Sequence, residues 1–167
     1  MGFAALPLES GREGGRKLIV EREIMKGTVC VFNRNRESFL GLRVRLADTM
    51  GSRLKGMLGK LHLNPGDGIW LIPSRGIHTI GMLFAIDLIY LDSMNRVIHM
   101  VEHLGPFRIS PIRIRCASIL ELGSRTIYSS NTQIGDELLI CAPEDIRLHC
   151  SGAGAQTVFP EIGIEGE

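Results

Sequence analysis

The sequence predicts a mainly β protein: a single-domain β-sandwich or small barrel of short, mostly antiparallel strands with one amphipathic helix. Two observations carry this prediction. Short apolar stretches recur between tight turns, and strands do not alternate regularly with helices. The chain has 167 residues, of which 44% are hydrophobic. A chain of this length is typical of one domain whose core needs no disulfide or metal ion.

We expect the ordered domain to span residues 25–142. Residues 1–24 mix Gly, Glu and Arg without periodicity, which predicts a disordered lead and makes Met25 an alternative start of translation. Residues 143–167 are rich in glycine and aperiodic, so they predict a loose C-terminal tail. The lead has no basic segment followed by a sustained apolar one, and a secretory signal is therefore not expected.

The first predicted elements are two strands and a helix. One strand begins within "MKGTVCVFN", and residues 39–47 alternate Leu and Val with Arg, as a half-buried strand does. Asp48 or Thr49 then caps a helix over about 48–61. Its apolar residues fall at helical spacing: Met50, Leu54, Met57, Leu58 and Leu61.

Turn residues separate the strands that follow. "NPGDG" at 64–68 predicts a turn in which Gly66 or Gly68 takes a positive φ. "DSMN" at 92–95 joins its neighbouring strands tightly, which predicts a hairpin. The expected strands cover 69–73, 84–91, 96–103, 116–122 and 137–142, with a short helical turn at 124–131.

Composition and charge argue against several classes of protein. The formal net charge is +1, which gives no general electrostatic attraction to nucleic acid or to an anionic membrane. The densest basic run, "RISPIRIR" at 108–115, fits a solvated strand or loop edge best. No apolar run reaches the ~20 residues that span a bilayer. The cysteines show no CxxC spacing, so the sequence indicates neither a zinc ribbon nor a redox pair, and with no recognisable phosphate loop or metal cluster neither a cofactor nor a metal is expected. Reduced thiols predict a cytoplasmic protein; they are Cys30, Cys116, Cys141 and Cys150.

Five motifs occur in a fixed order: "RLKGMLGKLHL", "GIHTIGMLFAIDLIYLD", "RVIHMVEHLGPFRIS", "ILELGS" and "GDELLI". Together, over roughly residues 40–142, they resemble the domain-of-unknown-function family 192. The resemblance implies a compact, mostly β domain of the sandwich class. It implies no particular reaction, because the family is named for lacking one.

Asp87 is the most unusual residue of the apolar segment "GIHTIGMLFAIDL". Both faces of its predicted strand are apolar, so the strand is central and the carboxylate is buried. A buried charge requires donors, and the candidates are the backbone amides of the 80–84 turn with His78, Arg53 or Arg75. Asp87 is then either a structural carboxylate or a functional one.

Polar side chains gather just before this strand, in "PSRGIHTIGM". A hydroxyl, a guanidinium and an imidazole close together suit a small polar or anionic ligand. The alternative for His78 is a hydrogen-bonded structural histidine. The candidate ligand-binding residues are Ser74, Arg75, His78, Thr79, Met82 and Asp87.

Glu121 repeats the pattern of a carboxylate in an apolar strand. With Asp87 it would form a general acid–base pair if the two met in space, or it would form an ion pair with an arginine, for which Arg53 is a candidate. His99 and His103 lie four residues apart, but on a strand this spacing separates them by about 13 Å. They are therefore not expected to share a metal ion.

Three functions follow from these residues. The favoured one is a binding or accessory module with a polar-lined pocket for a small polar or anionic ligand. The second is a module that docks a protein partner through a sheet edge or the 104–115 loop. The third is an enzyme that uses Asp87, Glu121 and His78, which the lack of a nucleophile motif disfavours.

Overall fold

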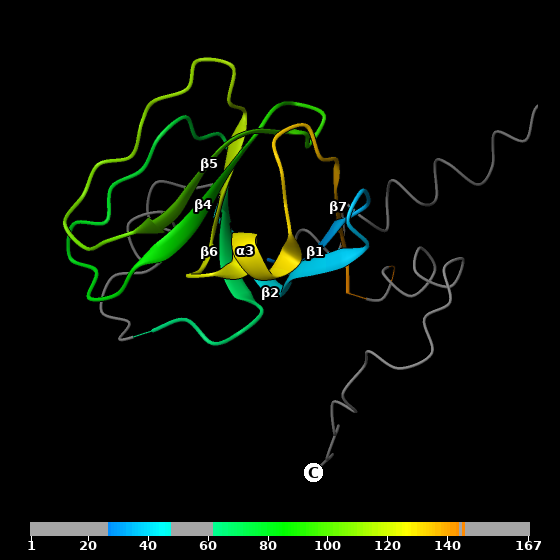
Figure 1. Ribbon diagram of the computed structural model, residues 1–167, viewed down its shortest axis with the longest axis horizontal. Helices are drawn as coiled ribbons and strands as arrows, with labels where there is room; N and C mark the ends of the chain where they lie inside the picture. Colours follow the sequence, from blue (N-terminus) through cyan, green and yellow to red (C-terminus); the bar gives the residue numbers. More distant parts are fainter. Residues whose placement is uncertain (1–26, 48–61, 144, 146–167) are drawn as a thin grey trace, which may run out of the picture.

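The computed structural model describes residues 27–47, 62–143 and 145. The predicted lead, the predicted helix at 48–61 with Arg53, and Cys150 lie outside the described residues. The described part contains seven strands and a short helix (Figure 1). They are β1 (Thr28–Asn33), β2 (Ser38–Ala47), β3 (Asp67–Leu71), β4 (Ile86–Leu91), β5 (Val97–Leu104), β6 (Ser118–Gly123), α3 (Thr126–Ser130) and β7 (Leu138–Cys141).

All seven strands belong to one curled sheet in the order β5-β4-β6-β3-β2-β1-β7. Only β2 and β3 pair in parallel, and every other neighbouring pair is antiparallel. The mainly β class is therefore confirmed. Of the two predicted architectures, the small barrel is the closer one, because a single sheet curls into a half-barrel and no second sheet packs against it in the described residues (Figure 1).

Backbone hydrogen bonds close the half-barrel at one end, where the two edge strands meet. The amide of Val97, at the start of β5, donates to Asp136 O at 2.9 Å, and the amide of Gly135 donates to Val97 O at 2.8 Å. Leu138, at the start of β7, donates to Asn95 O at 3.0 Å. These bonds hold the segment before β7 against the β4–β5 hairpin. This is the hairpin predicted from the turn at 92–95, and it is confirmed.

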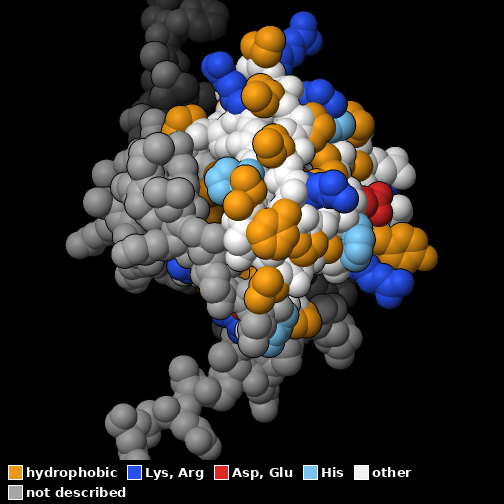
Figure 2. Space-filling model, turned by 90° about the vertical axis from the view of Figure 1, so that its left-hand side faces the viewer, with side chains coloured by type: hydrophobic (Ala, Val, Ile, Leu, Met, Phe, Trp, Pro, Cys, Tyr) orange, Lys and Arg blue, Asp and Glu red, His pale blue; other side chains and the backbone are white. Residues whose placement is uncertain are grey.

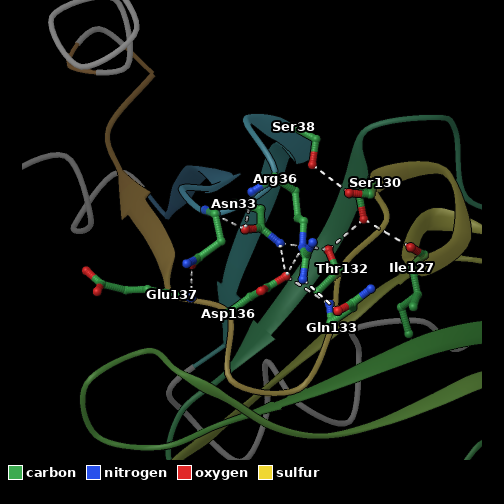
Figure 3. A network of polar contacts seen from close by, with 10 residues as sticks. Asn33, Arg36, Ser38, Ile127, Ser130, Thr132, Gln133, Asp136 and Glu137 are labelled. Atoms are coloured by element: carbon green, nitrogen blue, oxygen red, sulfur yellow. Dashed lines mark hydrogen bonds and ion pairs between the residues drawn. The ribbon is translucent and has the colours of Figure 1, made fainter. Parts of the chain in front are cut away.

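A buried polar network holds this closure against the β1–β2 turn (Figure 3). Asp136 Oδ2 accepts hydrogen bonds from Asn33 Nδ2, Arg36 Nε and the amide of Gln133, at 2.9, 3.1 and 2.9 Å. Burial alone would raise the pKa of Asp136, but these donors and the charge of Arg36 outweigh it and lower the pKa. The carboxylate form of Asp136 therefore links segments about a hundred residues apart in the sequence.

The sheet buries apolar side chains on both faces. One cluster fills the inside of the curl and includes Val44, Trp70, Leu120 and Leu122. The other lies on the opposite face beneath the segments around 77–85 and 98–116. Every residue of β4 is buried, as predicted from its two apolar faces. Among the described residues, no helix is long and apolar enough to cross a membrane.

Candidate functional site

Asp87 is fully buried, and its carboxylate binds two backbone amides. Oδ1 accepts the N–H of His103 in β5, and Oδ2 accepts the N–H of Ile127 in α3, each at 2.9 Å. The prediction of a buried, hydrogen-bonded Asp87 is confirmed. The prediction that backbone amides of the 80–84 turn donate to it is wrong. Asp87 pairs with Leu122 and so faces the inside of the curl, away from that turn. None of the described side chains donates to it.

The two segments that Asp87 binds both contain a residue in the left-handed region. His103 has φ 52° and Arg125, directly before α3, has φ 74°. Around His103, β5 bulges: Ile86 pairs with Leu104 and Leu88 with Val101, so two residues of β5 lie opposite Asp87. Each such residue costs about 1–3 kcal/mol and persists only where surrounding contacts impose it. Asp87 supplies one contact to each segment.

His103 and the residues before α3 meet at the surface above Asp87. The Nδ1 atom of His103 lies 2.7 Å from the hydroxyl oxygen of Ser124, at hydrogen-bond distance. Here a cleft of about 360 Å³ opens. Its lining residues are Asp87, Glu102, His103, Ser124, Arg125 and Tyr128. The cleft thus combines an imidazole, a hydroxyl and a guanidinium with one exposed carboxylate.

A larger cavity of about 610 Å³ adjoins this cleft, and the two share Ser124 and Arg125. Its other walls come from β2, from residues 62–66 before β3, and from the residues before β4. Phe39, Leu42 and Phe84 give it apolar surface. A polar cleft that continues into an apolar cavity is the usual form of a small-molecule site.

The residues predicted to bind a ligand lie elsewhere, apart from Asp87. The hydroxyl of Thr79 is buried, donates to Gly105 O at 2.7 Å and accepts the N–H of Arg108 at 2.9 Å. Ser74 donates to Gly76 O, and Met82 packs in the outer apolar cluster. Arg75 and His78 are exposed on the same loop. Asp87 faces the inside of the sheet, so the structure does not bring the six together.

Glu121 is buried on the face of the sheet opposite to Asp87, since it pairs with Ile69 and Leu88 of the outer cluster. The two acids therefore do not form a pair. No described residue donates a hydrogen bond to the Glu121 carboxylate, and Arg53, its candidate partner, lies outside the described residues. Burial raises the pKa of Glu121 to about 7.

His99 and His103 have separate surroundings on β5. The ring of His99 lies edge-on to Tyr90, and its Nε2 atom is 3.1 Å from Arg113 Nη2. Burial, and then the charge of Arg113, lower the pKa of His99. No group of three or more His, Cys, Asp or Glu side chains able to hold a metal ion occurs in the part of the chain that the structure describes.

One signal for the cleft is present in the sequence at the end of the strand that precedes α3. Strand spacing excludes a shared metal ion for His103 and His99, and local pattern places Ser124 and Arg125 in a helical turn, so neither feature by itself predicts the cleft. A polar "GSR" directly after an apolar strand marks a place where the chain leaves the sheet, which is a common location for binding residues.

Comparisons with known proteins give a family but no activity. A family model described as an uncharacterised group, DUF192, matches residues 31–140. A UPF0127 protein of Thermococcus sibiricus is 31% identical over 101 residues, which cover 58% of this chain and 64% of that protein. The chain thus spans less than two thirds of this relative's length.

Two solved structures share the fold at 18% sequence identity. One is a protein of unknown function from Novosphingobium aromaticivorans, with a TM-score of 0.58 over 67% of this chain and 83% of that one. The other, from Sinorhizobium meliloti, bears the provisional name of a transcription regulator, with a TM-score of 0.56 over 68% and 92%. At this identity the likeness shows the fold alone. The family match covers most of the chain, and we conclude that the chain belongs to the DUF192 family of uncharacterised proteins.

Proposed function

We propose that this domain is a small-molecule-binding module whose ligand occupies the cleft at His103, Ser124 and Arg125. The observation that carries the proposal is the arrangement around Asp87. One buried carboxylate holds two segments with left-handed residues, His103 and Arg125, on the two sides of a single cleft. Strained residues held in place by such contacts concentrate at binding and catalytic sites.

The chemistry of the cleft favours an anionic ligand with an apolar part. A guanidinium forms strong paired hydrogen bonds with carboxylate or phosphate, and the imidazole and hydroxyl add further polar contacts. The exposed Glu102 on the rim disfavours ligands that carry more than one anionic group. The adjoining cavity, with Phe39 and Phe84, would take an aliphatic or aromatic portion of the ligand.

A ligand screen with matched variants tests the proposal. Purified protein is screened by thermal shift against alkyl carboxylates and aryl phosphates, and the best compound is measured by calorimetry. Arg125→Gln should weaken binding at least tenfold at an unchanged melting temperature, because Arg125 is exposed. Arg108→Gln, an exposed arginine outside the cleft, should bind as the parent does. Equal affinities of all three proteins would contradict the proposal.

An enzyme that uses Asp87, Glu121 and His78 receives no support from the geometry. Asp87 and Glu121 face opposite sides of the sheet, and His78 lies on an exposed loop. The Asp87 carboxylate binds the backbone of His103 and not its imidazole. A cytoplasmic location remains a prediction, which cell fractionation with an antibody to the protein would test.

A further inference from the structure

Two long connections form a single surface at the left-hand end of the molecule in Figure 1. The segment 74–84 leads into β4, and the segment 105–117 leads from β5 to β6. Backbone hydrogen bonds tie them together: Thr79 N–H to Arg108 O at 2.8 Å, Phe107 N–H to Thr79 O at 3.0 Å and Ser110 N–H to Ile77 O at 2.9 Å. The hydroxyl of Tyr90 anchors the second segment through Pro111 O at 2.9 Å.

Large apolar side chains project from these two segments into solvent. Six of them are more than half exposed, and Ile114 reaches 82%. They are Ile80, Leu83, Phe107, Ile109, Ile112 and Ile114. We call these side chains and the arginines of the same two segments the Ile–Arg surface. Figure 2 shows orange apolar groups spread across this end of the molecule with blue basic groups among them. Contiguous exposed apolar groups mark interaction sites.

The charge within the two segments has one sign, and Asp92 of the β4–β5 turn is the acidic residue that lines a groove with Ile112 and Arg115. The two segments contain the exposed arginines Arg75, Arg108, Arg113 and Arg115, and neither segment contains an Asp or Glu. In "RISPIRIR" each isoleucine has an arginine next to it in the sequence. The net charge of the whole chain is only +1, and this local excess is therefore not a property of the whole chain.

We propose that the Ile–Arg surface docks the protein on an anionic lipid bilayer. Projecting apolar side chains suit a fluid interface, into which they insert without a preformed complementary pocket. The neighbouring guanidinium groups reach lipid phosphates at the same depth. Because hydrogen bonds already hold both segments, docking requires little further ordering of the backbone. The proposal is independent of the ligand cleft.

Vesicle cosedimentation with the full chain tests this inference. The protein should sediment with vesicles of phosphatidylcholine and phosphatidylglycerol, and at least tenfold less with phosphatidylcholine alone. Half-molar salt should release most of it. Ile112→Asp with Ile114→Asp should reduce binding at least tenfold, and Arg108→Gln with Arg115→Gln should reduce it severalfold. Met94→Asp serves as the matched control, because Met94 is equally exposed but lies in the β4–β5 turn.

Melting temperatures near that of the parent would show that the variants are folded. No sedimentation with the anionic vesicles would overturn the proposal, as would equal binding by the Ile112→Asp/Ile114→Asp variant. The proposal would also be overturned if the protein bound an acidic amphipathic peptide in a fluorescence titration but did not bind anionic vesicles. That result would identify the partner as a protein.

Discussion

Two carboxylates in neighbouring strands show how differently a buried acid is accommodated. Asp87 binds two backbone amides and keeps the segments around His103 and Ile127 in place. Glu121, on the opposite face, lies among Ile69 and Leu88 with no donor in the described residues, and its pKa is raised to about 7. Asp87 therefore serves as a hydrogen-bond acceptor for two backbone amides, whereas burial favours the protonated, uncharged form of Glu121.

Removal of the Asp87 carboxylate should destabilise the fold. Asp87→Ala leaves two amides without an acceptor, each at a cost of about 1–3 kcal/mol, so we expect a loss of about 3 kcal/mol or more in the free energy of unfolding. Asp87→Asn keeps one acceptor and should lose less. His78→Ala, an exposed position, is the control. Urea denaturation measures all three, and a parental midpoint for Asp87→Ala would refute the role of Asp87.

The raised pKa of Glu121 predicts a pH dependence of stability. Since the folded state holds the proton more tightly than the unfolded state, the stabilisation is complete below the unfolded pKa of 4.5 and is lost as pH rises through about 7. The loss amounts to about 3 kcal/mol at 1.36 kcal/mol per pKa unit.

Glu121→Gln should remove this slope and be more stable than the parent at pH 8. Denaturation series between pH 4.5 and 8 on both proteins measure it. A parent and a variant with parallel pH profiles would show that Glu121 is not the group responsible.

At the scale of single residues, the sequence predicts which carboxylates are buried but not which groups donate hydrogen bonds to them. Alternation in a strand identifies which side chains are buried, and Asp87 and Glu121 were both found in this way. The donors to Asp87 come from residues 16 and 40 positions further along the chain. They depend on a bulge in β5 and on the start of α3, which no local pattern specifies.

At the scale of elements, the turn before β3 positions both a sheet strand and a cavity wall. Gly66 has φ +80°, and its carbonyl oxygen accepts the amides of Leu42 and Arg43 at 2.8 and 2.9 Å. Gly68 lies against β6, where a Cβ atom would stand 2.9 Å from Glu121 O and 2.7 Å from Leu122 Cδ2. The two glycines are thus required for different reasons, conformation for Gly66 and space for Gly68.

Valine at either glycine should therefore lower the melting temperature. Gly66→Val forces a β-branched residue into the left-handed region, which we expect to cost more than about 1 kcal/mol. Gly68→Val should cost more, because the neighbouring atom is backbone. Asp67→Ala is the control, since it removes an ion pair with Arg43 and a hydrogen bond from Asn64 Nδ2, both at the surface. If both valine variants melt as the parent does, this interpretation of the turn is wrong.

Most strands could be predicted because apolar alternation and turn residues are local signals. The predicted strand at 69–73 is observed at Asp67–Leu71, and that at 84–91 begins at Ile86. The parallel pairing of β2 with β3 could not be predicted, because the crossover between them leaves no pattern in either strand.

At the scale of the whole molecule, contacts between segments far apart in the sequence hold the single sheet in its curled shape. The cleft lies beside this sheet. The contacts of Asn33 and Arg36 with Asp136, and of Val97 with Gly135, join parts of the chain that local patterns treat separately. The sequence therefore indicated a mainly β domain but left open whether it has one sheet or two. It also could not place the cleft, which needs β4, β5, β6 and α3 together.

The boundaries predicted for the domain, residues 25–142, are tested by limited proteolysis. We expect trypsin to trim both ends and leave a stable core of about this length, identified by mass spectrometry, because hydrogen-bonded strands resist cleavage. The described strands begin at Thr28 and end at Cys141. A resistant fragment that retains residues 1–24 would move the boundary.

An NMR titration tests most directly whether the cleft at His103, Ser124 and Arg125 binds a small anionic ligand. Hexanoate and phenyl phosphate are added to ¹⁵N-labelled protein while backbone amide shifts are recorded. We expect saturable shifts at residues 102–104 and 124–128, which Arg125→Gln weakens and Arg108→Gln does not. Saturable shifts confined to residues 74–82, or none with any anion that stabilises the protein, would contradict it.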